Sequence, residues 1–155
     1  MFDMDGVLCD YVYWREFNHA IKENGKTDFG KIISIGSLFW ANMPWLDEGQ
    51  RLYNYVHEYV MTHSDIEIGI HSAVHLCCGK IGKQDWVRKN CPDIDMKNVK
   101  IDDDGHFKHI TGTVDEILVD DRKENVKDYL DAGYPAVLFT TAGDTFMNVI
   151  KLIGQ

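Results

Sequence analysis

Two hydrophobic patterns alternate along this chain. Apolar side chains at helical spacing predict helices at residues 10–24, 44–63, 83–89, 126–130 and 146–153. Short apolar runs predict buried strands at residues 66–70, 99–101, 117–119 and 136–139, and a turn is predicted at Asp104-Gly105. Gly25 and Gly133 lie where two of the helices would end in a left-handed conformation. Short strands alternating with helices indicate an α/β fold with a doubly wound parallel sheet.

The short first strand and the long stretch of chain between it and the next strand determine the predicted domain organisation. Only Met1 and Phe2 precede the first acidic residue, whereas a central strand should have about five residues. This shortness implies a truncated amino terminus or an unusually short first strand. About 55 residues then separate this strand from the next, which is too long for a single crossover helix. We therefore predict a core of residues 1–9 and 64–155, with a small helical cap, residues 10–63, inserted after strand one.

Composition and charge narrow the class of protein. Among 155 residues, 16 Lys and Arg stand against 25 Asp and Glu, a formal charge of -9 that repels polyanions and disfavours a nucleic-acid polymer as partner. No apolar run approaches the roughly 20 residues of a membrane span, and no signal peptide is recognised. The four cysteines lack CxxC spacing, which indicates free thiols and a cytoplasmic protein.

Carboxylates gather at the ends of two predicted strands. Asp3 and Asp5 follow the first strand, and Asp120 and Asp121 directly follow the strand at 117–119. Either pair alone also fits a turn or a helix cap. Together at one sheet edge they would repel each other strongly unless a cation lay between them. Oxygen ligands suit a hard ion, so the sequence predicts a Mg²⁺ site.

Two further polar residues lie between the acidic pairs and complete a recognisable order. Ser72 follows the predicted strand at 66–70, Lys83 opens the next helix, and Lys80 is an alternative to Lys83. The chain resembles the four motifs of the haloacid dehalogenase-like (HAD) superfamily of phosphotransferases at Asp3-Met4-Asp5-Gly6-Val7-Leu8, Ser72, Lys83 and Val119-Asp120-Asp121-Arg122. Within it, the chain most resembles the 5'(3')-deoxyribonucleotidases, because of Phe39-Trp40 and Lys83-Gln84-Asp85-Trp86-Val87. The expected fold is therefore a HAD-like Rossmannoid core with a cap.

The resemblance implies roles for the acidic and phosphate-binding residues. Asp3 would attack the phosphorus, and Asp5 would protonate the leaving alkoxide and later activate water. Ser72 and Lys83 would donate hydrogen bonds to the phosphoryl oxygens. The nucleotidases usually have Thr-Ser where this chain has His71-Ser72. Either the Ser72 hydroxyl carries the phosphate contact, with His71 as a further phosphate-binding candidate, or the motif is weakened.

The resemblance also implies which residues hold the metal. Mg²⁺ would bind the Asp3 side chain, the Asp5 backbone carbonyl and Asp121, with Asp120 as water-mediated support. The ion would offset the charge between the nucleophile and the phosphate.

The predicted cap is rich in aromatic residues. Most of them are expected to build the core of the cap. By resemblance, Phe39 and Trp40 are expected to form a wall for a nucleobase. Stacking tolerates any base, so base preference stays open.

These expectations converge on an enzyme that dephosphorylates deoxyribonucleoside monophosphates through an aspartyl phosphate. One alternative keeps the chemistry but takes a sugar phosphate or a nucleic-acid 3'-phosphate. Another is a non-catalytic phosphate- or metal-binding module, which the acid at Asp5 argues against. The oligomeric state is left open, and a homodimer is one assembly that the sequence allows.

Overall fold

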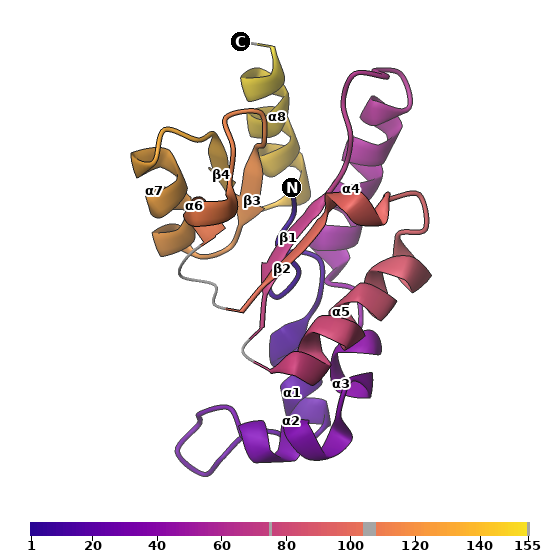
Figure 1. Cartoon of the computed structure of the whole chain (residues 1–155), viewed down its shortest axis with the longest axis vertical. Helices are drawn as coiled ribbons and strands as arrows, with labels where there is room; N and C mark the ends of the chain where they lie inside the picture. The colour runs from indigo at the N-terminus through magenta and orange to yellow at the C-terminus, as the bar shows by residue number, and fades with distance from the viewer. Residues whose placement is uncertain (75, 104–107, 155) are drawn as a thin grey trace.

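The computed structural model describes residues 1–74, 76–103 and 108–154, and the predicted turn at Asp104-Gly105 lies outside them (Figure 1). The strands are β1 (Ile70–Ala73), β2 (Val99–Asp102), β3 (Leu118–Asp120) and β4 (Ala136–Leu138). The helices are α1 (Tyr11–Phe17), α2 (Phe29–Ile35), α3 (Leu38–Ala41), α4 (Asp47–Val60), α5 (Cys77–Asn90), the 3-10 helix η1 (Met96–Asn98), α6 (Lys108–Thr111), α7 (Lys123–Asp131) and α8 (Ala142–Ile153). The prediction of a mixed α/β protein is confirmed.

The strands form two parallel pairs with the amino-terminal segment between them. β1 pairs with β2, and β3 pairs with β4. Phe2 makes parallel bridges to both Ile70 of β1 and Val119 of β3. The backbone N–H of Asp3 donates to the Val119 carbonyl at 2.9 Å. The carboxyl ends of β1, β3 and this segment therefore lie side by side.

The helices divide between two ends of the molecule. α1, α2 and α3 gather near α5, far from the carboxyl-terminal helix α8 (Figure 1). α4, the last element of the predicted cap, packs instead against α8. Trp86 of α5 is fully buried, and its indole N–H donates to the Met43 carbonyl at 2.7 Å, which ties α5 to the segment before α4. No helix of the described residues has the length and apolarity needed to cross a membrane.

The first predicted helix is shorter than expected. α1 ends at Phe17 rather than near residue 24, because Asn18 caps it and His19 turns into a left-handed conformation at φ 53°. Ile21 then pairs with Thr27 across a turn. Gly25, at φ 77°, serves this turn instead of ending a helix. Gly133, by contrast, has the expected left-handed conformation just after α7.

The boundaries around β1 and α5 also differ from the prediction. β1 starts at Ile70, where the predicted run ended, because pairing with β2 extends the strand through the polar residues His71 and Ser72. α5 starts at Cys77, so Lys83 lies inside the helix rather than at its beginning. The glycines that suggested a loop, such as Gly82, are helical because α3 packs directly against them.

Candidate active site

The loop after Phe2 places the first two aspartates. Asp3 is only 6% exposed. The chain then turns at Gly6, which has a φ of 83°, a conformation that glycine adopts without strain. A Cβ atom at Gly6 would lie 2.3 Å from Asp121 Oδ2. Glycine at this position therefore brings the Asp3–Asp5 loop into contact with the chain after β3.

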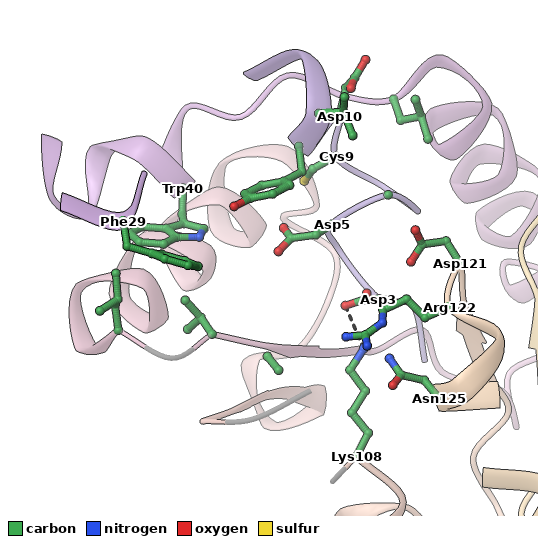
Figure 2. Close-up of a pocket in the computed structure, with 17 residues that line it drawn as sticks. Asp3, Asp5, Cys9, Asp10, Phe29, Trp40, Lys108, Asp121, Arg122 and Asn125 are labelled. Carbon is green, nitrogen blue, oxygen red and sulfur yellow. Dashed lines mark ion pairs between the residues drawn. The ribbon is translucent and has the colours of Figure 1, made fainter. Parts of the chain in front are cut away.

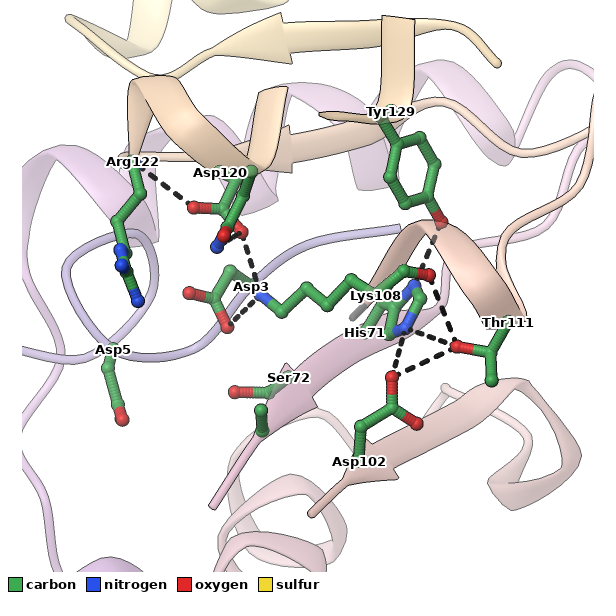
Figure 3. Close-up of polar contacts among 12 residues, drawn as sticks. Asp3, Asp5, His71, Ser72, Asp102, Lys108, Thr111, Asp120, Arg122 and Tyr129 are labelled. Carbon is green, nitrogen blue, oxygen red and sulfur yellow. Dashed lines mark hydrogen bonds and ion pairs between the residues drawn. The ribbon is translucent and has the colours of Figure 1, made fainter. Parts of the chain in front are cut away.

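A buried lysine joins the two acidic pairs. Lys108, the first residue of α6, is 2% exposed. Its ammonium nitrogen lies 2.9 Å from Asp3 Oδ1 and 2.7 Å from Asp120 Oδ2 (Figure 3). A charged amine at this depth is stable only with such partners. Burial would lower the pKa of Lys108, but the charges of Asp3 and Asp120 raise it overall, so the amine stays protonated.

Asp120 and Asp121 have different surroundings. Asp120 is fully buried and accepts hydrogen bonds from Lys108 Nζ, from the Arg122 backbone N–H and from Asn125 Nδ2. Asp121 is exposed and lines a cavity. Its pKa is raised to about 6, first by partial burial and then by the charges of Asp3 and Asp120. Asp120 is therefore saturated with donors, whereas Asp121 remains available to a ligand.

Three carboxylates converge on one point. Asp3, Asp120 and Asp121 each offer an oxygen atom, and these atoms lie within 4.8 Å of one another. Such a set of oxygen donors can hold a hard divalent cation. Of the residues predicted to bind metal, the structure thus brings these three side chains together.

A second buried lysine holds Asp5. Lys83 is fully buried, and its Nζ donates to Asp5 Oδ2 at 2.9 Å, to Ser72 Oγ at 2.9 Å and to the Ala73 carbonyl at 2.8 Å. Asp5 Oδ1 is buried and has no hydrogen-bond partner among the described residues. This oxygen is therefore free to accept or carry a proton. Lys80, the alternative lysine, is exposed on α5 and does not line the cavity.

The pKa values of Asp3 and Asp5 are shifted in opposite directions. Burial opposes ionisation of Asp3, but the charges of Lys108 and Lys83, with a hydrogen bond from Ser72, hold its pKa below the usual value. Burial raises the pKa of Asp5, with a further rise from the charge of Asp3, and Lys83 offsets only part of this. Two neighbouring carboxyls whose pKa values are shifted apart suit a nucleophile and a proton donor.

Asp3, Asp5, Lys108 and Asp121 line a cavity of about 520 Å³, whereas Ser72, Lys83 and Asp120 lie behind its wall. Figure 2 shows Trp40 and Phe29 toward one end of this cavity, with Asp121, Arg122 and Asn125 toward the other. Phe39, predicted to share the aromatic wall with Trp40, is fully buried and does not line the cavity. Its ring packs against Tyr11, Trp14 and Trp40 instead. Phe29, which sequence analysis did not single out among the cap aromatics, lines the cavity in its place.

His71 also lies apart from the acidic group. Successive side chains of a strand point to opposite faces, so Ser72 faces Lys83 while His71 faces away. The His71 ring is fully buried, with its nitrogens 3.0 Å from Tyr129 Oη and 2.8 Å from Asp102 Oδ2. Both nitrogens are thus occupied, and the predicted phosphate contact of His71 is not supported.

Lys108 is the residue that sequence reasoning missed. It lies on a one-turn helix, too short to show hydrophobic periodicity. The sequence signal that could have indicated Lys108 is its position after the strand predicted at 99–101. The segment after that strand reaches the same sheet edge as the segments after β1 and β3. A lysine in that segment was therefore a candidate by position alone.

No protein-family model and no curated protein matches this chain. The assignment of a function rests on the arrangement of these side chains.

Proposed function

We propose that this chain is a Mg²⁺-dependent phosphomonoesterase that acts through a phosphorylated Asp3. One observation carries the proposal: a buried carboxylate, kept ionised by Lys108, lies at a cavity beside a second carboxyl whose pKa is raised. A binding module for phosphate would need lysines and amide donors, but it would not need an anionic nucleophile and a proton donor next to each other.

The residues divide the reaction into two steps. An Asp3 oxygen attacks the phosphorus, the ester P–O bond breaks, and the leaving alkoxide takes the proton of Asp5. Asp5, now ionised, then removes a proton from a water molecule, which attacks the phosphorus and releases inorganic phosphate and the Asp3 carboxylate. The contact of Lys83 and Ser72 with the phosphoryl oxygens stays a prediction, because neither residue lines the cavity and the three N–H groups of Lys83 donate to Asp5, Ser72 and the Ala73 carbonyl.

The donor set fits a magnesium ion. Three carboxylate oxygens lie within 4.8 Å of one another. The pKa of Asp121 is raised first by burial and then by the charges of Asp3 and Asp120, and a cation would relieve this repulsion. We propose that Asp3, Asp121 and the Asp5 carbonyl hold the ion, with Asp120 behind them. When bound, Mg²⁺ would neutralise charge between the nucleophile and the phosphate.

We also propose the finer architecture, a doubly wound HAD-like core with a cap formed from residues 10–63. The parallel order β2, β1, residue 2, β3, β4 is consistent with a crossover that reverses at the amino-terminal segment. Ligands of such sheets bind at that reversal, at the carboxyl ends of the strands. Asp3, Ser72 and Asp120 lie there.

The proposed substrate is a deoxyribonucleoside monophosphate. The cavity has carboxylates and Lys108 at one end and aromatic rings at the other, so it is suited to a small molecule with a phosphate and a flat apolar group. Nucleobases stack on aromatic side chains regardless of their sequence identity. The reaction and the substrate are tested separately.

The reaction is tested by release of phosphate from an aryl phosphate, with EDTA and with Mg²⁺. Activity is expected only with Mg²⁺. Asp121→Ala should raise the Mg²⁺ concentration for half-maximal activity more than about 100-fold, whereas Asp120→Ala, which removes a supporting residue, should raise it about 10- to 100-fold. Full activity in chelator would exclude the metal mechanism, and the reverse ranking of the two variants would overturn Asp121 as the direct ligand.

Stability provides the matching control for these two variants. Asp120→Ala leaves Lys108 buried with one partner lost, so it should lower the free energy of unfolding more than Asp121→Ala does. Phosphate binding without turnover in the wild type would favour a non-catalytic module. A panel of monophosphates then separates nucleotides from sugar phosphates.

The substrate is tested at Trp40. Trp40→Ala should lower kcat/KM for a deoxyribonucleoside monophosphate roughly 10- to 100-fold, because stacking on a base contributes about 1 to 3 kcal/mol. It should change kcat/KM for a small aryl phosphate little, since that substrate does not reach the aromatic end of the cavity.

Two neighbours of Trp40 serve as controls. Leu38→Ala changes an exposed residue of the same helix and should leave both substrates unaffected. Phe39→Leu changes a buried residue and should affect both substrates equally if it has any effect. A parallel loss for both substrates in Trp40→Ala would make Trp40 a packing residue and remove the main support for a nucleotide.

A further inference from the structure

A polar cluster that runs from two buried side chains to the surface lies behind the acidic group, on the opposite face of β1. It consists of His71 on β1, Asp102 on β2, Thr111 on α6 and Tyr129 on α7, and we call it the His71 cluster (Figure 3). His71 and Tyr129 are fully buried. Residues of four separate elements thus meet at the His71 imidazole. In the proposed function this imidazole does not contact the substrate.

The hydrogen bonds of the His71 cluster fix its protons. Asp102 Oδ2 accepts from its neighbours, so His71 Nε2, 2.8 Å away, carries a proton and Nδ1 accepts from Tyr129 Oη at 3.0 Å. Burial lowers the pKa of His71, in keeping with a neutral ring. The Thr111 hydroxyl lies 2.9 Å from Asp102 Oδ2 and 3.0 Å from His71 Nε2. Every member therefore has a partner.

The cluster is connected to Lys108 through α6. This helix has four residues, too few to be stable by its own hydrogen bonds. Lys108 is its first residue and Thr111 its last, and the Thr111 hydroxyl also lies 3.2 Å from the Lys108 carbonyl. A Cβ atom on Gly112 would lie 2.5 Å from Tyr129 Oη, so the chain after the helix packs closely on the same cluster. Lys100, outside the cluster, also contacts the end of α6, because its Nζ donates to the Thr111 carbonyl at 2.9 Å.

We propose that His71 is a positioning residue, which through Thr111 and Tyr129 holds α6 so that the Lys108 ammonium stays between Asp3 and Asp120. The effect of this positioning on catalysis rests on the proposed function, whereas its effect on the stability of α6 does not. The sequence departure at His71-Ser72 thereby acquires a role: Ser72 faces the site, and His71 anchors the lysine from the other side of the strand.

Three variants test the proposal, each removing one part of the cluster. Thr111→Val and Tyr129→Phe each delete a hydroxyl with little change of shape, and His71→Gln deletes the ring. Val149→Ala, a buried substitution on α8 away from the cavity, is the control for general destabilisation. Hydrogen exchange of the amides of residues 109–112 reports on α6 without any substrate, and titration with inorganic phosphate in Mg²⁺ reports on the lysine.

We expect faster exchange at residues 109–112 in the three cluster variants and not in Val149→Ala. Loss of one hydroxyl should weaken phosphate binding roughly 3- to 10-fold, the effect of a single neutral hydrogen bond. In a Lys108→Ala background the same substitutions should have no further effect on phosphate affinity, because the residue being positioned is gone.

Several outcomes would overturn the proposal. One is an unchanged rate of hydrogen exchange at residues 109–112 in cluster variants that fold. Another is an equal increase of that rate in Val149→Ala. A third is that the cluster substitutions weaken phosphate binding as much in the Lys108→Ala background as in the wild type. If the wild type neither binds nor hydrolyses phosphate esters, the proposed function fails, while the exchange data still decide whether the cluster holds α6.

Discussion

Asp3→Asn is expected to lower kcat for phosphate release by at least about 1,000-fold, because an amide is a poor nucleophile and a neutral metal ligand. The structure strengthens this expectation beyond residue type. Asp3 is buried beside Lys108, and the pKa of its carboxyl is held below the usual value, so the native group is ionised under all ordinary assay conditions. The measurement is single-turnover and steady-state release of phosphate from an aryl phosphate.

Asp10→Asn is the matched control for this substitution. Asp10 also lines the cavity, and its side chain accepts a hydrogen bond from the Tyr13 backbone N–H at the start of α1. Asparagine caps helices about as well as aspartate, so the control removes one cavity carboxylate without disturbing α1. If Asp3→Asn keeps a tenth of the wild-type kcat, or if Asp10→Asn is as damaging, Asp3 is not the nucleophile.

Lys108→Met should be costly for both stability and activity. Removing the ammonium leaves Asp3 and Asp120 without their shared cation, which should lower the free energy of unfolding by about 3 to 5 kcal/mol. The loss of a fixed positive charge beside the reacting group should lower kcat about 100- to 1,000-fold. Because Mg²⁺ would bind Asp3, with Asp120 behind it, added Mg²⁺ should recover part of the lost stability. Thermal or urea unfolding with and without the ion measures this.

Lys80→Met provides the same chemical change on the exposed surface of α5. It should alter neither the unfolding free energy nor kcat appreciably. Equal behaviour of the two variants would show that Lys108 has no special role at the carboxylates. A Lys108→Met protein that is equally unstable with and without Mg²⁺ would argue against a cation site there.

The sequence predicted the acidic half of the candidate site better than the basic half. Asp3, Asp5, Asp120 and Asp121 follow apolar runs directly, and the edge rule for parallel sheets is enough to bring such residues together. For a lysine, position after a strand is a weaker signal, since lysines are common on any exposed surface. Lys83 lies beside Asp5 and Ser72 although its helix was predicted to start too late. Lys108 depends on a short helix that only its tertiary contacts hold in place.

The predicted element boundaries that were wrong have a common physical cause. Tertiary contacts override the local pattern of hydrophobic residues. His71 and Ser72 interrupt the apolar run but belong to β1, because Phe2 and β2 pair with the strand on its two sides. The predicted helix at 10–24 breaks because the segment after Phe17 folds back on itself. The choice between Phe39 and Phe29 was also a matter of packing, since either aromatic residue fits the composition of a small cap.

The glycines of α5 carry a consequence for protein engineering. Glycine inside a helix is less favourable than alanine by about 1 kcal/mol, so Gly→Ala substitution in helices is a usual route to thermostable variants. In α5 that rule should reverse. A Cβ atom on Gly82 would lie 2.2 Å from the Ser37 carbonyl oxygen and 2.9 Å from Trp40 Cβ, and one on Gly79 would meet Val74 and the Trp40 ring. Alanine at Gly82 would push α3 away from α5, the helix that carries Lys83, and alanine at Gly79 would displace the Val74 side chain and crowd the Trp40 ring. Stabilisation guided by helix propensity should therefore leave these two residues unchanged.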